Sequence, residues 1–294
     1  MNKVVIVTGV SSGLGKAFAT ALLQAGYKVV GTVRKQEAVG EFEQLQPGSA
    51  FARILDVTDT PERLASVVEE VERKVGPVYA LINNAGYGHE GTLEESSMDE
   101  LRQQFEVNVF GAAAMMKAVL PHMRSRREGR ILKVTSMGGL MTMPGLSYYH
   151  GSKFALEGIS SSLAKEVRPL GIYVTAVEPG MFRTDWAGRS MVRSERKIAD
   201  YDAIFDPIRE ARKSRSGQQP GDPAKAGKAI VELLTSTEPP LHLLLGSDAF
   251  DFVQKELDAL RVEFSNWESL TRSTNFERPD TVPAPSGDYS TGTF

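Results

Sequence analysis

The sequence predicts an α/β fold with a doubly wound parallel sheet of about seven strands and helices on both faces. Several short runs of β-branched and other apolar residues are apolar throughout, as expected for strands that helices cover on both faces. These runs alternate with amphipathic stretches, which gives repeated strand–helix–strand units with right-handed crossovers. A glycine-rich turn at Thr8–Gly15 directly follows the first run. Together these patterns favour a sheet with a ligand crevice at the carboxyl ends of its strands.

The predicted elements follow one another along the chain. The strands are Val4–Val7, Tyr27–Val33, Phe51–Leu55, Tyr79–Ile82, Arg130–Thr135, Ile172–Val177 and Leu241–Leu245. The helices run over residues 14–25, 61–74, 98–126 with a break near Asn108, 149–168, 223–234 and 250–270. Thr60 and Asp222 are expected to cap helices because each precedes a proline in the first helical position. The last helix offers apolar side chains for packing, namely Phe252, Leu257, Leu260, Phe264 and Trp267.

No linker or repeat precedes residue 270, so residues 1–270 are predicted to form one domain. The stretch over residues 183–222 is polar and weakly periodic, which is typical of a lid or binding loop. Residues 271–294 are predicted to form a tail, since their last part is rich in Pro, Ser, Thr and Gly.

The composition excludes several classes of protein. The 294 residues are 41% hydrophobic and 24% charged, as in ordinary soluble proteins. The net charge of −3 gives no sign of nucleic-acid binding. The chain has no cysteine, so disulfides and cysteine-ligated metals are excluded, and no metal site is expected. We expect a cytoplasmic protein, because the absence of cysteine fits a reducing compartment. No membrane span is expected, because no apolar run approaches the roughly 18–20 residues that a span requires.

Two glycine-containing motifs lie at the ends of predicted strands. In Thr8-Gly-Val-Ser-Ser-Gly-Leu-Gly15, glycines allow a sharp turn and a close approach to a diphosphate, and the following helix favours negative charge. Asn83-Asn-Ala-Gly86 follows the fourth strand, where small residues suit a ligand that lies across the sheet edge. Taken singly, either motif is also consistent with a turn that serves only packing.

Tyr149 and Lys153 are four residues apart on a predicted helix, so phenol and ammonium share one face. A nearby cation favours the phenolate, and we therefore expect a lowered pKa for Tyr149 and a role as proton donor and acceptor. Tyr148 has Ser152 at that spacing instead of lysine. Ser136 ends the fifth strand and Asn108 interrupts a long helix, although a turn residue and a helix irregularity explain them equally well.

The chain resembles the short-chain dehydrogenase/reductase family, in its compact single-domain branch with a Rossmann-type fold. The resemblance covers about residues 3–247. It rests on the family's motifs standing in order at residues 8–15, 83–86, 149–153 and 179–184.

The resemblance implies a role for each matching residue. Tyr149 is the general acid for ketone reduction and the base for alcohol oxidation. Lys153 binds the nicotinamide ribose and lowers the Tyr149 pKa, Ser136 hydrogen-bonds the substrate oxygen, and Asn108 holds a relay water. Residues implied to contact the cofactor are Gly9, Ser11, Ser12, Gly13, Leu14, Gly15, Asp56, Val57, Asn83, Ala85, Gly86, Pro179, Phe182 and Thr184. Three alternatives remain on this fold: an isomerase or epimerase that keeps its cofactor, an enoyl reductase, and a catalytically silent NADP-sensing regulator.

The end of the second strand favours NADP(H) over NAD(H). An acidic residue there would bind the ribose 2′-hydroxyl, whereas an arginine accommodates a 2′-phosphate. Val33 occupies the acidic position and Arg34 follows it. A solvated loop arginine is the alternative explanation.

The residues that flank the expected site favour a bulky apolar ketone or secondary alcohol, because methionine-rich linings adapt to varied apolar shapes. These residues are Met137, Leu140, Met141, Met143, Leu146, Met181, Phe182 and Trp186, of which several could simply pack beneath loops. The chain is similar here to the 17β-hydroxysteroid-dehydrogenase-like group. The resemblance also implies a homodimer or homotetramer through the helices at 108–124 and 149–168, where residues 111–114 are small.

Overall fold

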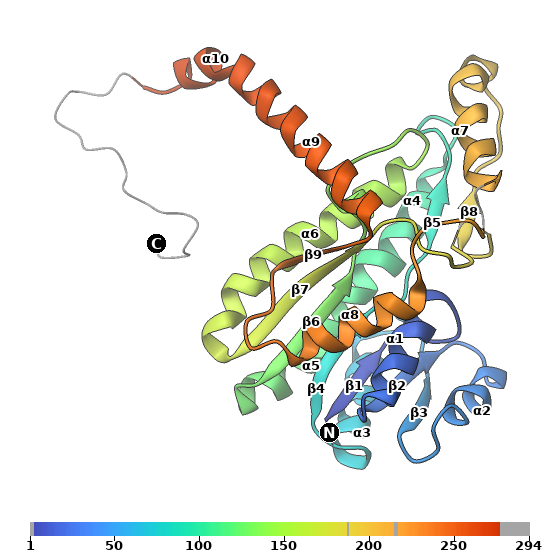
Figure 1. Cartoon of the computed structure of the whole chain (residues 1–294), viewed down its shortest axis with the longest axis vertical. Coiled ribbons are helices and arrows are strands. Elements are labelled where there is room, and N and C mark those ends of the chain that lie inside the picture. Colours follow the sequence, from blue (N-terminus) through green and yellow to red (C-terminus); the bar gives the residue numbers. More distant parts are fainter. Residues whose placement is uncertain (1–2, 187, 215–216, 277–294) are drawn as a thin grey trace.

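Seven parallel strands form the centre of the molecule, with helices on both faces (Figure 1), which confirms the predicted fold class. The computed structural model describes residues 3–186, 188–214 and 217–276. The strands lie in the order β3-β2-β1-β4-β6-β7-β9. Their bounds are β1 (Val4–Val7), β2 (Lys28–Val33), β3 (Ala50–Ile54), β4 (Val78–Asn83), β6 (Gly129–Val134), β7 (Ile172–Pro179) and β9 (His242–Leu245). Each predicted strand is present, with its ends within two residues of the expected ones.

The helices form two layers. They are α1 (Gly13–Gln24), α2 (Glu37–Glu43), α3 (Pro61–Lys74), α4 (Met98–Phe105), α5 (Gly111–Arg126), α6 (Ser147–Val167), α7 (Asp202–Ser214), α8 (Pro223–Thr235), α9 (Ser247–Asn266) and α10 (Glu268–Ser273). Apolar residues of α1 and α8 pack on one face of the sheet, and those of α3, α5 and α6 on the other. The side chains of Thr60 and Asp222 cap α3 and α8 as predicted.

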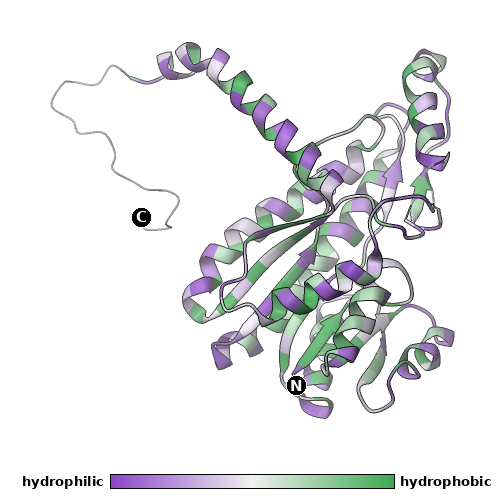
Figure 2. Cartoon of the chain, in the orientation of Figure 1, coloured by the Kyte–Doolittle hydropathy of each residue, from purple (hydrophilic) through white to green (hydrophobic). Residues whose placement is uncertain are grey.

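Strand β1 is apolar throughout because both of its faces are covered. Val5 and Val7 pack with Phe18 of α1, whereas Val4 and Ile6 face the opposite helix layer. Figure 2 shows the result as apolar strands between helices whose residues are mixed in hydropathy.

The strand order reverses between β1 and β4 in the middle of the sheet. Strands β2 and β3 follow on the side of β1, and β6, β7 and β9 follow on the side of β4. In such sheets the carboxyl ends of the two central strands leave a crevice that binds ligands. The glycine-rich turn after β1 and the motif at residues 83–86 after β4 therefore meet at this crevice.

Part of the stretch at residues 183–222 forms regular structure, whereas the sequence suggests an irregular loop. Strand β8 (Met191–Arg193) pairs with β5 (Gly88–Glu90), and α7 follows. The Glu90 side chain is 1% exposed, and its oxygens lie 3.1–3.2 Å from Arg193, Arg209 and Arg212. Buried ion pairs therefore hold this stretch on the body of the domain. Residues 187, 215 and 216 lie outside the described residues.

Helix α9 differs most from its prediction. Phe264 and Trp267 are 68% and 61% exposed, and within α9 only Ala249 and Val253 are buried. Figure 1 shows α9 extending away from the sheet, so the sheet does not cover these apolar side chains. The predicted tail at 271–294 begins inside α10, and residues 277–294 lie outside the described residues.

Two expectations about domain and assembly stay predictions. The domain limit at residue 270 is untested. The small residues expected at a subunit interface partly pack inside the chain, because Gly111 lies against Val57 and the Ala112 carbonyl accepts a hydrogen bond from Asn83. Among the described residues, no helix has both the length and the apolar character that a membrane crossing requires.

Candidate active site

The turn between β1 and α1 requires its glycines. Gly9 and Gly13 have φ angles of +73° and +59°, a region that residues with a side chain rarely adopt. A Cβ on Gly15 would lie 2.2 Å from the Gly9 carbonyl oxygen. Ser12 stands at the N-cap of α1 without a side-chain bond to the helix, so within this described turn the first N–H groups stay available to an anion. The turn thus fits the diphosphate of a dinucleotide.

Thr8 and Asn84 join this turn to the end of β4. The Thr8 hydroxyl accepts hydrogen bonds of 2.9 Å from the backbone N–H groups of both Asn84 and Ala85. The Asn84 amide donates back to the carbonyls of Thr8 and Gly9, at 2.9 and 3.1 Å. The Asn83 amide donates to the Ala112 carbonyl and ties β4 to α5, and its contact with the cofactor stays a prediction.

Tyr149, Lys153, Ser136 and Gly86 lie together, as the sequence predicts. Tyr149 and Lys153 stand on α6, both buried, with the Lys153 ammonium 5.7 Å from the centre of the Tyr149 ring. The Ser136 hydroxyl, at the end of β6, hydrogen-bonds Tyr149. A Cβ on Gly86 would lie 3.9 Å from the Lys153 nitrogen. Three chain segments therefore meet around Tyr149 and Lys153.

The expected fall in the Tyr149 pKa is wrong for this structure. Burial raises the pKa of Tyr149 to about 12, and the Ser136 hydrogen bond offsets only part of this effect. Burial also lowers the pKa of Lys153 to about 8, although the negative charge of Glu157 opposes this change. The Lys153 ammonium donates to the Val134 carbonyl at 2.9 Å, so it faces the strand. Desolvation thus outweighs the attraction between ammonium and phenolate.

Asn108 lies at the predicted break, in a π-helical turn between α4 and α5 (Glu106–Phe110). Its amide group donates to the Tyr87 carbonyl and to Ser152, both at 3.1 Å. Its side-chain oxygen accepts a 3.1 Å hydrogen bond from the Tyr87 N–H. The side chain therefore fixes α6 to the segment after β4, and the relay water stays a prediction.

His150 was missed as a site residue, although it directly follows Tyr149. Its Nε2 accepts from the Met143 N–H at 2.9 Å, so Nδ1 carries the proton and donates to the Gly138 carbonyl at 2.7 Å. Burial lowers the pKa of His150, which favours this neutral form. His150 thereby holds the loop at residues 137–143, which carries several of the proposed substrate contacts.

The segment after β7 lies opposite the glycine-rich turn. The Thr184 Cβ is 3.9 Å from the Cβ position of Gly13. Two contacts fix the conformation of this segment. The Met181 N–H donates to Asp248 at 2.7 Å, and Phe182 forms a β-bridge with Gly221. Residues 179–184 thus border the crevice.

Arg34 and Asp56 stand beyond the ends of neighbouring strands. Arg34 is exposed directly after β2, and its charge is open to solvent. One Asp56 oxygen accepts hydrogen bonds from the Thr58 N–H and hydroxyl at 3.0 and 2.8 Å, so Asp56 shapes its own turn. Val57 is buried against Gly111.

Apart from Phe182, which packs against the main core, the predicted apolar lining gathers in two clusters that share Met143. One contains Tyr149, Leu146 and Met191, with Met143 and Trp186 packed against them. The Tyr149 and Trp186 rings are 5.2 Å apart. The other cluster joins Met137, Leu140, Met141, Met143 and Met181 to Ala249 and Val253 of α9.

Comparison with known proteins establishes the family. The short chain dehydrogenase family model matches residues 3–194, so the chain belongs to the short-chain dehydrogenases and is an oxidoreductase of a class that binds a nicotinamide cofactor. Among relatives, 3-ketodihydrosphingosine reductase from Bacteroides thetaiotaomicron is 36% identical over 83% of this chain and 88% of its own.

Two solved structures agree with the fold. A short-chain dehydrogenase from Streptomyces avermitilis has a TM-score of 0.86 and 43% identity, covering 93% of this chain and 98% of its own. ElxO with NADP bound has a TM-score of 0.71 and 25% identity, covering 85% of this chain and all of its own (100%). Both confirm the Rossmann-type α/β architecture.

Proposed function

We propose that this short-chain dehydrogenase is an NADP(H)-dependent carbonyl reductase that interconverts a ketone or aldehyde with the corresponding alcohol. The observation that carries the proposal is the buried Tyr149 phenol, which the Ser136 hydroxyl contacts and the Lys153 ammonium approaches from one helical turn away. The crevice with its glycine-rich turn lies beside them.

Tyr149 acts as the general acid in this proposal. With a pKa raised to about 12, its hydroxyl keeps its proton at neutral pH and can give it to a carbonyl oxygen. The Ser136 hydroxyl holds that oxygen, and both hydroxyls stabilise the charge that develops there. The reduced nicotinamide, when bound, supplies the hydride to the carbonyl carbon. Because the raised pKa of Tyr149 disfavours the phenolate, the protein without its cofactor holds this residue in the protonated form that reduction requires.

Arg34 is proposed to select NADP(H). Its guanidinium follows β2 in an exposed position, where it can pair with a 2′-phosphate. The solved structure of ElxO holds NADP, which supports the same choice here.

Arg34→Ala is expected to raise the KM for NADPH by about tenfold to a hundredfold, as for the loss of a charge-assisted hydrogen bond. The KM for NADH should change by less than about threefold, because NADH has no phosphate at this position. Steady-state kinetics with both cofactors checks the prediction. Equal losses with the two cofactors would contradict the assignment of Arg34.

The substrate is proposed to be bulky and apolar. The first cluster places Met143, Met191 and Trp186 beside the phenol, and Met143 also belongs to the second cluster. The flexible thioether side chains can adapt to a large apolar group. Trp186 and α7 belong to the stretch that we propose as the substrate lid. Phe205 of α7 contacts Gly145, so α7 touches the loop that borders the first cluster. The similarity to a 3-ketodihydrosphingosine reductase agrees with a ketone substrate.

Oxidation of NADPH by the purified full chain tests the function, using steroidal, aryl, long-chain and small hydrophilic ketones in separate assays. We expect turnover with NADPH and the highest kcat/KM for the large apolar ketones. Faster turnover of small hydrophilic carbonyls would contradict the proposed substrate class. NADPH binding without its net consumption by any carbonyl would instead favour an isomerase or a regulator.

A further inference from the structure

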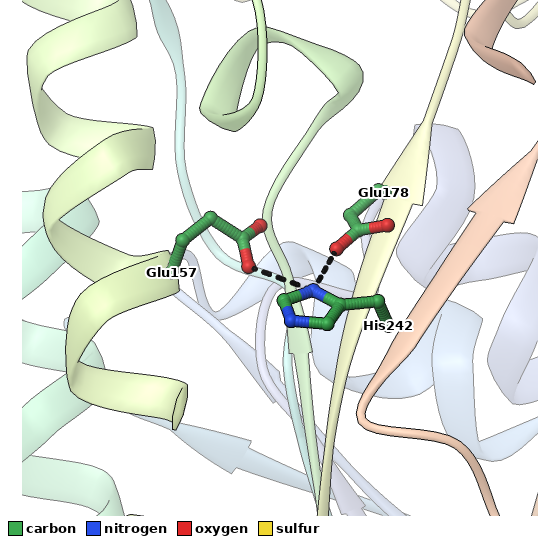
Figure 3. A group of neighbouring side chains, drawn as sticks. All are labelled: Glu157, Glu178 and His242. Atoms are coloured by element: carbon green, nitrogen blue, oxygen red, sulfur yellow. Dashed lines mark hydrogen bonds and ion pairs between the residues drawn. The ribbon is translucent and has the colours of Figure 1, made fainter. Parts of the chain in front are cut away.

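A polar cluster lies between α6 and the sheet, on the face opposite to α1 and α8. Glu157 of α6, Glu178 of β7 and His242 of β9 converge there (Figure 3). His242 Nδ1 lies 2.7 Å from a Glu178 oxygen and 3.5 Å from a Glu157 oxygen. One candidate ligand atom from each residue can be chosen so that all three lie within 4.8 Å of one another.

The sheet register creates this cluster. Ala176 of β7 pairs with His242 of β9, and Glu178 follows Ala176 by two residues, so both functional side chains project from the same face. That face is the one that α6 covers. The three residues are far apart in the sequence and form no spacing motif, which is why the sequence predicts no metal site.

The two carboxylates are buried without adequate partners. The Glu178 side chain is fully buried (0% exposed) and that of Glu157 is 8% exposed. Both oxygens of Glu157 and one oxygen of Glu178 lack a hydrogen bond of good geometry. Buried carboxylates normally have such partners or a bound cation, because desolvating a negative charge is costly. One imidazole nitrogen is thus shared by two buried acids.

Neighbouring groups offset the carboxylate charges only partly. Lys133 of β6 is near enough to be influenced by Glu157, but its fully buried nitrogen has no hydrogen-bond partner among the described residues. The Lys153 ammonium donates to Val134, and the Thr135 hydroxyl, which approaches Glu157, also donates to the Val177 carbonyl. A cation between the carboxylates would therefore neutralise negative charge that the neighbouring residues leave uncompensated.

We propose that Glu157, Glu178 and His242 Nδ1 bind a divalent transition-metal ion, with Zn²⁺ as the best match. Tetrahedral Zn²⁺ with bonds of about 2.0–2.2 Å spaces its ligand atoms about 3.3 Å apart. The three ligand atoms already lie within 4.8 Å of one another, and Glu178 would move slightly away from His242 to reach this spacing. The two carboxylates balance the charge of the ion. An imidazole donor favours Zn²⁺ over Mg²⁺ or Ca²⁺, which prefer oxygen ligands.

The ion could enter the site from solvent, and it would link two strands to a helix. The His242 side chain is 43% exposed, so the site opens to solvent there and a water can take the fourth position. Glu157 follows Lys153 by one helical turn. The ion would consequently join β7 and β9 to the helix that carries Tyr149. This inference does not depend on the proposed reductase activity.

Titration calorimetry of the chelator-treated full chain with Zn²⁺, beside thermal unfolding, tests the site. We expect one equivalent to bind, and the Tm to rise by about 5 °C at a concentration about a hundredfold above the Kd. Mg²⁺ should give no comparable rise. His242→Gln should weaken Zn²⁺ binding at least tenfold and remove the rise in Tm, and Glu178→Gln should do the same. His122→Gln, on α5 and outside the cluster, is the matched control and should bind as the native chain does.

Two results would overturn the proposal. One is the absence of saturable binding of a single equivalent to the native chain. The other is equal binding by the His242→Gln and His122→Gln variants, which would place the ion elsewhere. Because the His242 side chain is half-exposed, its substitution should not prevent folding. The comparison of His242→Gln with His122→Gln therefore tests the metal site even if Glu178→Gln fails to fold. Neither readout uses turnover, so failure of the metal site and failure of the reductase proposal are distinguishable.

Discussion

Tyr149→Phe is expected to lower kcat for ketone reduction by about a thousandfold, within the range for removal of a general acid. NADPH affinity should be nearly unchanged, because the aromatic ring and its contact with Trp186 at 5.2 Å remain. Stopped-flow measurement of hydride transfer together with fluorescence titration of NADPH separates the two effects. The prediction requires loss of the chemical step with binding preserved.

Tyr148→Phe is the matched control. The Tyr148 hydroxyl donates to the Ser96 carbonyl at 2.8 Å and is directed away from Lys153 and Ser136. Its removal should cost about 1 kcal/mol of unfolding free energy, the usual value of one hydrogen bond, and leave turnover nearly intact. Retention of more than a tenth of native turnover by Tyr149→Phe, or an equal loss in Tyr148→Phe, would argue against Tyr149 as the acid.

The difference between the expected and observed direction of the Tyr149 pKa has a clear physical origin. The helical spacing of Tyr149 and Lys153 predicts attraction between their charged forms. It contains no information about desolvation, which depends on segments distant in the sequence. Trp186 and the loop at residues 137–143 bury the phenol, and burial outweighs the neighbouring charge. Tertiary burial is therefore the part of site electrostatics that a local motif does not reveal.

The sheet was predictable because each strand has a local signature. The strands of this sheet are rich in apolar residues without a regular polar alternation, and each is followed by a glycine, proline or polar turn that marks its limit. β5 and β8 lack this signature, since Gly88–Glu90 includes two polar residues and its partner lies about a hundred residues later. Their pairing depends on the buried Glu90 and its arginines, which are distributed over residues 193–212. Such long-range ion pairs have no local pattern.

The candidate site was predictable where its motif residues face the crevice. The sequence placed Gly9, Gly15 and Tyr149 on the elements where the structure has them. It did not reveal which motif side chains also support the fold, as Asn83 does through its bond to α5. Nor did it reveal the role of His150, because hydrogen bonds to the backbone of a loop depend on that loop's conformation.

Gly15→Ala is expected to weaken NADPH binding at least tenfold and to lower the unfolding free energy by about 2–3 kcal/mol, the cost of overpacking a rigid site. The new Cβ would lie 2.2 Å from the Gly9 carbonyl oxygen and 2.4 Å from the Asn84 amide nitrogen. Neither atom moves freely, because the Asn84 amide donates to the carbonyls of both Thr8 and Gly9. The change would thus displace the turn that fits the diphosphate.

Gly40→Ala provides the comparison for Gly15→Ala, with urea unfolding and NADPH titration as the measurements. Gly40 lies in α2, and a Cβ there would meet no described atom within 4 Å apart from its chain neighbours and the backbone of its own helix. Removing a helical glycine restricts the unfolded chain, so this variant should gain about 0.5 kcal/mol of unfolding free energy and bind NADPH normally. Similar behaviour of the two variants would mean that the β1–α1 turn can accept a side chain. Opposite signs would show that the close approach of Gly9, Gly15 and Asn84 is what this sequence requires to hold a dinucleotide.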